Sequence, residues 1–244
     1  MIAGTPNTIA AQVAGRLRAA ILGGEYAPGE ALPPERALAV DLGTNRNTLR
    51  EAIRALDESG LVRARQGHGV RVLDFRGHGR LDLLPAFLAT DMVPVHERVA
   101  ALIDAMRFRS VFLVEAAALA AQRRNDEDVR ALRRASAAAL LERDDVVAAA
   151  ERELDFFGAL VGAAHSQIAT WALNTFAKVV TSVLERQPAL WVTPDGFEGT
   201  LRRVVLAIES ADPAAARRAM RTHLESSDAV VAPILSSLQT GDQR

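Results

Sequence analysis

Four polar side chains between residues 45 and 50 carry the donors and acceptors needed to read the edges of base pairs. They are Asn45, Arg46, Asn47 and Arg50. An arginine guanidinium can make two parallel hydrogen bonds to guanine, and an asparagine amide can make a matching pair with adenine. This readout requires the first turn of a helix to enter the major groove. We therefore expect the first three residues in such a turn, with Arg50 one turn further on.

The surrounding sequence predicts two short helices joined by a tight turn. Pro34 suits a first helical position because its missing N–H would be unpaired there, and a helix is expected over residues 35–42. Gly43 can adopt the positive φ that the turn requires. Asn45 can cap the next helix, which is expected from Arg46 to about Ser59. The apolar residues expected to be buried along this second helix are Leu49, Ile53 and Leu56.

A β-hairpin is predicted after the second helix, with strands over residues 61–64 and 69–73. Its basic side chains could neutralise phosphate charge, and Gln66 with Gly67 can approach a DNA backbone closely. The arginines of the hairpin are Arg63, Arg65 and Arg71. Arg54 and Arg63 could equally be solvated or paired with Glu51 or Asp57. Two helices followed by such a hairpin form a winged helix-turn-helix, a module that binds duplex DNA.

These motifs resemble the GntR family of bacterial transcription regulators over roughly residues 9–75. The family's patterns appear as GEYAPG at 24–29, LPPERALA at 32–39 and GTNRNTLREAI at 43–53. Asn45 departs from the serine or threonine that is usual in the family. The resemblance implies DNA contacts from the first helix, the recognition helix and the wing. The expected DNA-contacting residues are Arg36, Asn45, Arg46, Asn47, Thr48, Arg50, Arg65, Gln66 and Gly67.

The composition is that of a two-domain protein without disulfides. The chain has 244 residues, 49% of them hydrophobic, and no cysteine, which excludes a disulfide framework and thiolate metal sites. No apolar run approaches the roughly 20 residues of a membrane helix, and no signal peptide is recognisable, so a cytoplasmic location is expected. The net charge is −1, but arginines outnumber acids between Thr44 and Arg71. Local field rather than total charge governs DNA affinity.

The second half of the chain is predicted to be an all-α bundle of six or seven helices, which makes the fold mainly α. Residues 74–80 are glycine-rich and polar and are typical of a linker. N-cap signals occur at Asn125, Asp144, Thr193-Pro194 and Asp212-Pro213. Apolar residues recur with a helical period over 81–89, 94–124, 126–142, 144–164, 166–187, 194–211 and 213–238. The expected domains are residues 1–75 and 94–244, with residues 76–93 as linker and first helix.

An all-helical domain behind such a DNA-binding head is similar to the FadR-like subgroup, whose C-terminal part is the FCD domain. The resemblance is carried by Arg109 before an alanine-rich helix, by ELDFF at 153–157, by Ala207-Ile208 and by residues 217–223. It implies a homodimer that binds double-stranded DNA and a small-molecule effector. It also implies that the effector is a carboxylate or resembles an acyl-CoA, and that the regulator is more often a repressor than an activator.

Many members of the subgroup hold a divalent metal through an aspartate and three histidines. The pattern places Glu153, Phe157, Leu201 and His223 at these four positions. Phenylalanine and leucine cannot bind a metal ion. We therefore predict that the usual metal site is lost and that no cofactor is bound, as in the member that gives the subgroup its name. The alternative is a rebuilt site that uses Asp155, His165 or His223.

Arg109 lies where the subgroup places an inward arginine that pairs with the effector's carboxylate, although Arg107 competes for this role. His223 could instead be a hydrogen-bonded core residue. Trp191 and Phe197 could lie at the mouth of the pocket. Phe156, Phe157, Trp171 and Phe176 are expected mainly in the core. The expected effector-contacting residues are Arg109, Glu153, Phe157, Leu201 and His223.

The sequence gives no basis for an enzyme. It contains no G-x-S-x-G, P-loop or H-E-x-x-H motif, and no G-x-G-x-x-G follows a strand. The expected function is a ligand-responsive DNA-binding regulator that binds an inverted repeat as a homodimer. One alternative is a constitutive DNA-binding regulator with a vestigial effector pocket. The other is an enzyme fused to a DNA-binding head, which would need a catalytic pair in the bundle.

Overall fold

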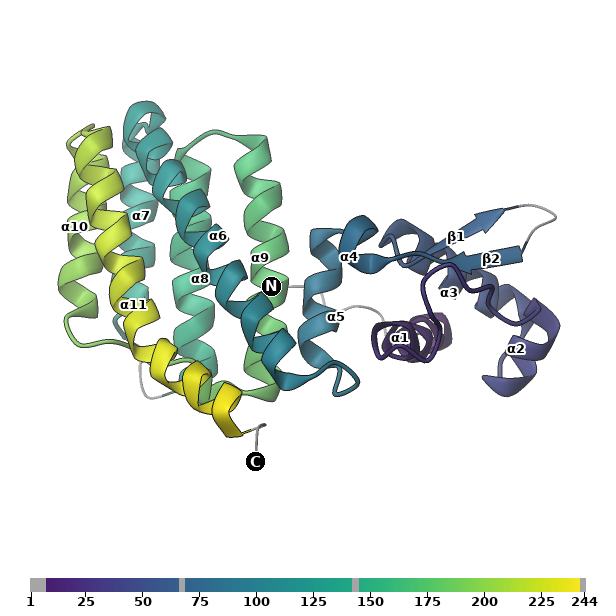
Figure 1. The fold of residues 1–244 in the computed structure, drawn as a ribbon. Helices are drawn as coiled ribbons and strands as arrows, with labels where there is room; N and C mark the ends of the chain where they lie inside the picture. Colours follow the sequence, from purple (N-terminus) through teal and green to yellow (C-terminus); the bar gives the residue numbers. More distant parts are fainter. Residues whose placement is uncertain (1–7, 66–68, 142–144, 242–244) are drawn as a thin grey trace. The chain divides into compact units, whose positions relative to one another are not determined.

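The protein is described by a computed structural model that covers residues 8–65, 69–141 and 145–241. Figure 1 shows the fold as a ribbon, coloured from the N-terminus to the C-terminus. The chain divides into two compact units, Met1–Pro94 and Val95–Arg244. The prediction of a mainly helical fold, with a winged helix-turn-helix followed by a helical bundle, is confirmed. Among the described residues, no helix is both long and apolar enough to span a bilayer.

The N-terminal unit begins with a helix that the sequence analysis did not assign. This helix is capped by Thr8, whose Oγ1 accepts a hydrogen bond from the Ala11 N–H at 3.1 Å. It packs against the recognition helix through a core that includes the fully buried Leu49 and Leu56. The elements of the winged module are α1 (Ile9–Leu22), α2 (Glu35–Asp41), α3 (Arg46–Glu58), β1 (Val62–Arg65) and β2 (Gly69–Val72).

The two wing strands pair antiparallel, with Val62 opposite Val72 and Arg65 opposite Gly69. A third segment joins them, because Ala31 forms an isolated bridge with Arg71. The segment before α2 thereby pairs with strand β2 of the wing. No local sequence signal predicts this pairing.

The segment expected as an irregular linker contains a short helix. Asp74 begins it by accepting a hydrogen bond from the Arg76 N–H at 3.0 Å. Gly79 then closes on the Phe75 carbonyl at 2.8 Å, where an added Cβ would meet that oxygen at 2.5 Å. The elements here are α4 (Phe75–His78), η1 (Leu81–Leu83) and α5 (Leu84–Ala89).

The C-terminal unit is a bundle of long helices in the segments that the apolar period predicts. Two of the longest, α6 and α11, lie side by side (Figure 1). Arg217 on α11 donates to both carboxylate oxygens of Glu115 on α6, and these hydrogen bonds hold the pKa of Glu115 below its ordinary value. The elements are α6 (Val95–Arg123), α7 (Asp126–Ala138), α8 (Val146–Ala163), α9 (Gln167–Arg186), η2 (Pro188–Leu190), α10 (Phe197–Glu209) and α11 (Pro213–Gly241).

The helix starts agree with the predicted caps at two of four places. Asn125 forms a capping box with Asp128, and Asp212 caps α11 by accepting from the Ala215 N–H at 2.9 Å. The cap predicted at Thr193-Pro194 is wrong, because α10 begins at Phe197, directly after Gly196. Gly196 is the N-cap residue and adopts a left-handed conformation with a φ of 75°. The cap predicted at residue 144 lies outside the described residues.

Two apolar clusters stabilise the helical unit. The main core lies between α6, α7, α8, α9, α10 and α11 and includes the fully buried Phe156. A smaller cluster, which we call the satellite core, is formed by Val99 on α6, Leu190 on η2 and Leu235 on α11. The satellite core therefore joins the first turns of α6 to the end of α11.

Candidate DNA-contacting surface and effector pocket

The recognition helix begins as predicted, at an asparagine that caps it. The Oδ1 atom of Asn45 accepts a hydrogen bond from the Thr48 N–H at 2.9 Å. This oxygen is the acceptor that a bidentate contact with adenine would use, so reading a base would compete with the cap. Asn47 has an exposed side chain in the same first turn. Asn47 is thus the exposed asparagine of this turn that does not form the cap.

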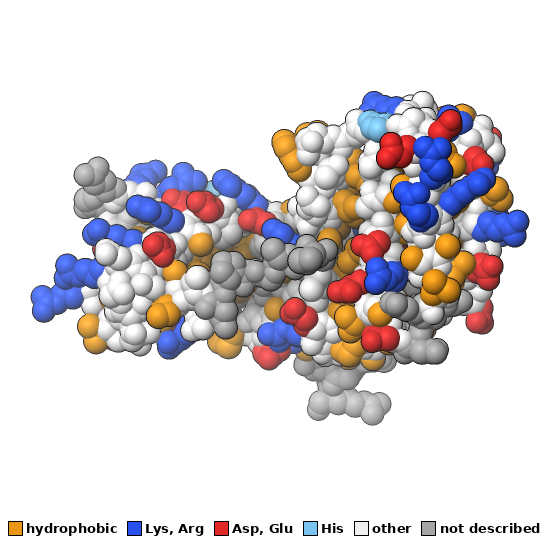
Figure 2. Space-filling model, turned by 180° about the vertical axis from the view of Figure 1, so that it is seen from behind, with side chains coloured by type: hydrophobic (Ala, Val, Ile, Leu, Met, Phe, Trp, Pro, Cys, Tyr) orange, Lys and Arg blue, Asp and Glu red, His pale blue; other side chains and the backbone are white. Residues whose placement is uncertain are grey.

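The arginines predicted to contact DNA are exposed, and one of them is held in place by a carboxylate. Arg36 and Arg46 are exposed at the starts of α2 and α3. The Nε of Arg50 donates to Oε2 of Glu35 at 2.9 Å, which links the two helices of the module. This contact leaves the outer guanidinium nitrogens of Arg50 for another acceptor. The N-terminal unit contains no lysine, so the blue side chains on its surface in Figure 2 are arginines.

Two of the three wing arginines are engaged within the protein. Arg71 donates to the Gly29 carbonyl at 2.8 Å and so supports the third segment of the sheet. Arg63 pairs with Asp57 at 3.5 Å, which is one of the alternatives left open by the sequence. Arg65 is exposed at the end of β1. The predicted contacts of Gln66 and Gly67 lie outside the described residues.

Four of the five residues expected to contact an effector lie together in the main core of the helical unit. The Nε2 atom of His223 lies 3.5 Å from Oε1 of Glu153. The ring of Phe157 meets the His223 ring edge-on, with centroids 6.3 Å apart. Leu201 is fully buried in the same core. The four residues that align with the family's ligand positions are thus close together in the folded chain. They lie within the packed core and do not line the apolar pocket described below.

The hydrogen bonds of Thr200 fix the tautomer of His223. The Thr200 hydroxyl donates its single hydrogen to the Phe197 carbonyl at 2.8 Å. It must therefore accept at its 2.9 Å contact with Nδ1 of His223, which carries a proton. The Nε2 atom has no hydrogen-bond partner among the described residues and faces the Glu153 carboxyl.

The residues at this place do not fit the metal site of the subgroup. His223 and Glu153 supply two ligands, and the remaining two positions hold the hydrocarbon side chains of Phe157 and Leu201. A second aromatic ring, that of Phe197, lies 5.2 Å from the His223 ring and closes another side. No group of three or more metal-ligating side chains forms among the described residues. The prediction that the site binds no metal thus has a steric reason and remains to be tested.

The residues considered for a rebuilt metal site are engaged elsewhere. Asp155 is exposed and pairs with Arg152 at 2.9 Å. His165 lies at the junction of α8 and α9 and its Nε2 is 2.8 Å from Oδ2 of Asp128. Among the described residues, neither side chain forms a hydrogen bond or an ion pair with His223.

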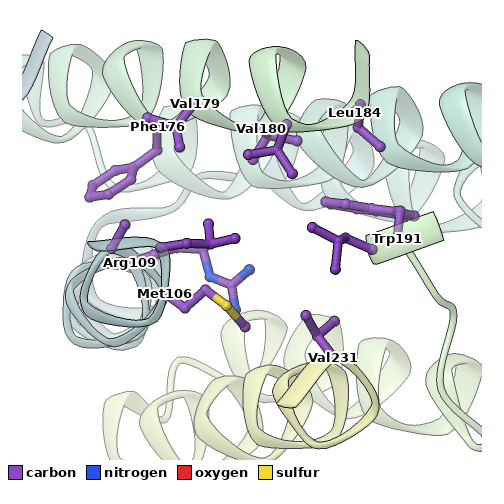
Figure 3. A pocket seen from close by; sticks show the side chains of 12 residues that line it. Met106, Arg109, Phe176, Val179, Val180, Leu184, Trp191 and Val231 are labelled. Atoms are coloured by element: carbon purple, nitrogen blue, oxygen red, sulfur yellow. The ribbon is translucent and has the colours of Figure 1, made fainter. Parts of the chain in front are cut away.

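An apolar pocket of about 620 Å³, counting the part open to solvent, lies elsewhere in the helical unit, between α6, α9, η2 and α11. Arg109 is the charged residue in its lining. Figure 3 shows its guanidinium between the side chains of α9 on one side and Val231 of α11 on the other. Trp191 lines the pocket, as the sequence suggested, whereas Phe197 packs on His223. Further lining residues include Met106, Phe176, Val180 and Leu184.

Among the described residues, Asp228 is the charged partner of the arginine in this pocket. The Nη2 atom of Arg109 donates to Oδ1 of Asp228 at 2.5 Å, and the Arg109 side chain is only 16% exposed. Its Nε is buried with no hydrogen-bond partner among the described residues. Arg107, the competing residue, is 78% exposed and lies 3.5 Å from Asp104. Arg109 is therefore the arginine that faces inward.

Sequence reasoning missed Asp228 and most of the pocket lining. Asp228 lies 119 residues from Arg109 in the chain, so no local pattern links them. Phe176, Val179, Val180, Val183 and Leu184 repeat with a helical period that is the same for a core face and for a pocket wall. Only the resemblance to a known family marked Arg109 as inward-facing.

Comparisons with known proteins agree with this architecture. Residues 9–72 match "Bacterial regulatory proteins, gntR family", and residues 104–226 match the FCD domain. The HTH-type transcriptional regulator Mce2R of Mycobacterium tuberculosis is 32% identical over 96% of this chain and 95% of its own length. The HTH-type transcriptional regulator LutR of Bacillus subtilis is 24% identical over 86% of this chain and 95% of its own.

One solved structure supports the fold over nearly the whole chain. It is described as Lar, which controls expression of the Listeria monocytogenes agr system. The two structures superpose with a TM-score of 0.60 at 17% sequence identity, covering 94% of this chain and 99% of that one. At this identity the likeness establishes the arrangement of elements and nothing about ligands.

Proposed function

The chain belongs to the GntR family of bacterial transcription regulators and carries an FCD domain, and on this premise we propose that it binds operator DNA as a homodimer and responds to a small molecule. It is a DNA-binding regulator and not an enzyme. The observation that carries the proposal of a ligand response is the apolar pocket of the helical unit, with the inward-facing Arg109 in its wall. We place its action in the cytoplasm, where bacterial DNA is found.

We propose that the regulator represses transcription by occupying its operator and that the effector weakens this occupancy. A ligand shifts such an equilibrium only if it binds the DNA-competent and DNA-incompetent states with different affinity. In a dimer, the spacing of two recognition helices must match two half-sites on one face of the duplex. A ligand that changes the packing of the helical unit can alter this spacing.

Exposed apolar side chains on α6 support self-association of the helical unit. Phe108 is 59% exposed and Val111 is 67% exposed, one turn apart on one face. Large exposed apolar residues that cluster commonly mark an interface. The Phe108 ring lies 5.8 Å from the ring of Phe176, which lines the pocket. A dimer contact at Phe108 would therefore be sensitive to what the pocket contains.

Native mass spectrometry of the full chain, alone and with a duplex selected for binding, tests this proposal. We expect two chains without metal in solution and two chains on one duplex. Phe108→Glu should shift the protein toward monomer because it places a charge in the contact, whereas Leu141→Glu, at another exposed apolar residue, should not. A monomer bound to a single half-site, or one metal ion per chain, would contradict the proposal.

A further inference from the structure

We propose that Asn45 is a specificity-determining residue that donates hydrogen bonds to guanine and does not read adenine, whereas Asn47 keeps the ordinary asparagine readout of adenine. The inference rests on the proposed function, since a residue determines specificity only if the chain binds a particular operator. It goes beyond that function by assigning different bases to two identical side chains in one helical turn.

The helix cap fixes which end of the Asn45 amide is free. The backbone N–H of Thr48 is a donor, so the Asn45 atom that it meets at 2.9 Å must be the oxygen, Oδ1. Asn45 has the extended backbone of an N-cap residue, with a φ of −91° and a ψ of 163°, which directs its side chain toward that N–H. The amide nitrogen, with both of its hydrogens, therefore lies on the side away from the Thr48 N–H.

While the cap is intact, Asn45 presents two donors to DNA and no acceptor. Its side chain is exposed, and its amide nitrogen donates to no group in the described part of the chain. Guanine presents two acceptors in the major groove, O6 and N7, whereas thymine presents one and cytosine only a donor. Guanine is therefore the base that matches an asparagine held in the cap.

Reading adenine would require Asn45 to give up the cap. Adenine presents a donor, N6, beside its N7 acceptor, and that donor needs the oxygen that the Thr48 N–H already occupies. Losing an N-cap costs a helix about a factor of five in its equilibrium constant, which is of the same order as the gain from one base contact. A contact with guanine carries no such cost.

Asn47 has the same side chain without this restriction. It is exposed in the first turn of α3, and its amide takes part in no hydrogen bond among the described residues. Its oxygen can accept from adenine N6 while its nitrogen donates to N7. The two asparagines thus differ because Asn45 occupies the N-cap of the helix and Asn47 does not.

The position of Asn45 favours a base edge over a phosphate. The N-terminal residues of a recognition helix face the base edges of the major groove. Arg46 and Asn47 follow directly and are exposed, and the first turn of α3 contains no acidic residue. A Cβ added at Gly43 would meet no atom within 4 Å, so the turn just before the cap leaves open space for the duplex.

Replacing Asn45 with aspartate reverses the hydrogen-bonding character of this side chain and keeps the cap. Aspartate caps a helix as well as asparagine does, and its charge is favourable at a helix N-terminus, so the thermal unfolding followed by circular dichroism should not change. The oxygen that replaces the amide nitrogen accepts hydrogen bonds, and a carboxylate accepts from N4 of cytosine. Selection from random duplexes with full-length Asn45→Asp should therefore replace guanine by cytosine at one position of each half-site.

Two further variants are the matched controls. Asn47→Asp places the same charge two residues later and should change an adenine of the selected sequence instead of a guanine. Asn45→Ser keeps the cap and one hydroxyl donor, so the guanine should remain with a weaker preference.

Fluorescence anisotropy measures the size of the effect. Exchanging the assigned guanine for cytosine should weaken binding of the parent about tenfold and should strengthen binding of Asn45→Asp. The added carboxylate weakens binding to every duplex, random DNA included, so the affinities for the two duplexes are compared as a ratio at one salt concentration.

Two results would overturn the inference and leave the proposed function standing. If Asn45→Asp selects the same inverted repeat as the parent and binds all duplexes more weakly by one factor, Asn45 contacts phosphate only. If Asn45→Asp changes an adenine position, the cap opens on DNA and Asn45 reads adenine. If the parent selects no sequence, the proposed operator binding fails together with the inference.

Discussion

Replacing Glu153 with alanine is expected to lower the free energy of unfolding of the helical unit by about 1–3 kcal/mol, the cost of leaving a buried polar group without a polar neighbour. The Glu153 side chain is 9% exposed, and His223 is fully buried. The substitution leaves the Nε2 atom of His223 facing a cavity instead of a carboxyl. Both tryptophans lie in this unit, so the urea dependence of tryptophan fluorescence reports its unfolding.

A matched double variant shows whether the loss of stability in Glu153→Ala comes from the missing polar partner of His223 or only from the lost side-chain volume. Glu153→Leu combined with His223→Phe removes both polar groups and fills the space with hydrocarbon, so most of the stability should return. If Glu153→Ala costs less than about 1 kcal/mol, the ordinary range of a single hydrogen bond, the two side chains do not form an energetically coupled pair.

Arg46→Ala is expected to weaken binding to the operator by about 1–3 kcal/mol, or about 5- to 140-fold, because a guanidinium that reads guanine loses both of its hydrogen bonds. Binding to random duplex DNA should fall much less, since that affinity comes from neutralised phosphates. Fluorescence anisotropy with the two duplexes at one salt concentration measures both effects.

Arg54→Ala is the matched control for this prediction. It removes the same charge from an exposed position of the same helix, two turns after Arg46 and outside the predicted contact set. Its effect on operator and random DNA should be small and equal. If Arg46→Ala weakens both duplexes by the same factor, Arg46 contacts phosphate and does not read a base.

The elements of the N-terminal unit could be predicted where the signal is local. The cap at Asn45, the turn at Gly43 and the apolar stripe of α3 depend on residues within a few positions of one another. The bridge from Ala31 to Arg71 could not be predicted from the sequence. It joins segments 40 residues apart through backbone atoms, which are the same in every residue type and so leave no sequence signal. Thr8 is a local N-cap signal that indicates the start of helix α1.

In the helical unit, the apolar period placed the helices but could not say which faces surround a pocket. The pairing of Glu153 with His223 followed from aligning the chain with a known ligand pattern, and the structure brings these two side chains together. The ion pair of Arg109 with Asp228 depends on how α6 and α11 pack along their length. That packing is determined by many weak contacts, so the pairing of Arg109 with Asp228 can be seen only in the folded chain.

The central claim is that this chain reads DNA sequence through its winged helix, and selection from a pool of random duplexes by the full-length protein tests it most directly. Several rounds of capture at physiological salt, with Arg46→Ala run in parallel, should enrich an inverted repeat for the parent. The recovered duplex should bind the parent at least about a thousandfold more tightly than random DNA. No enriched sequence, or the same enrichment with Arg46→Ala, would contradict the account.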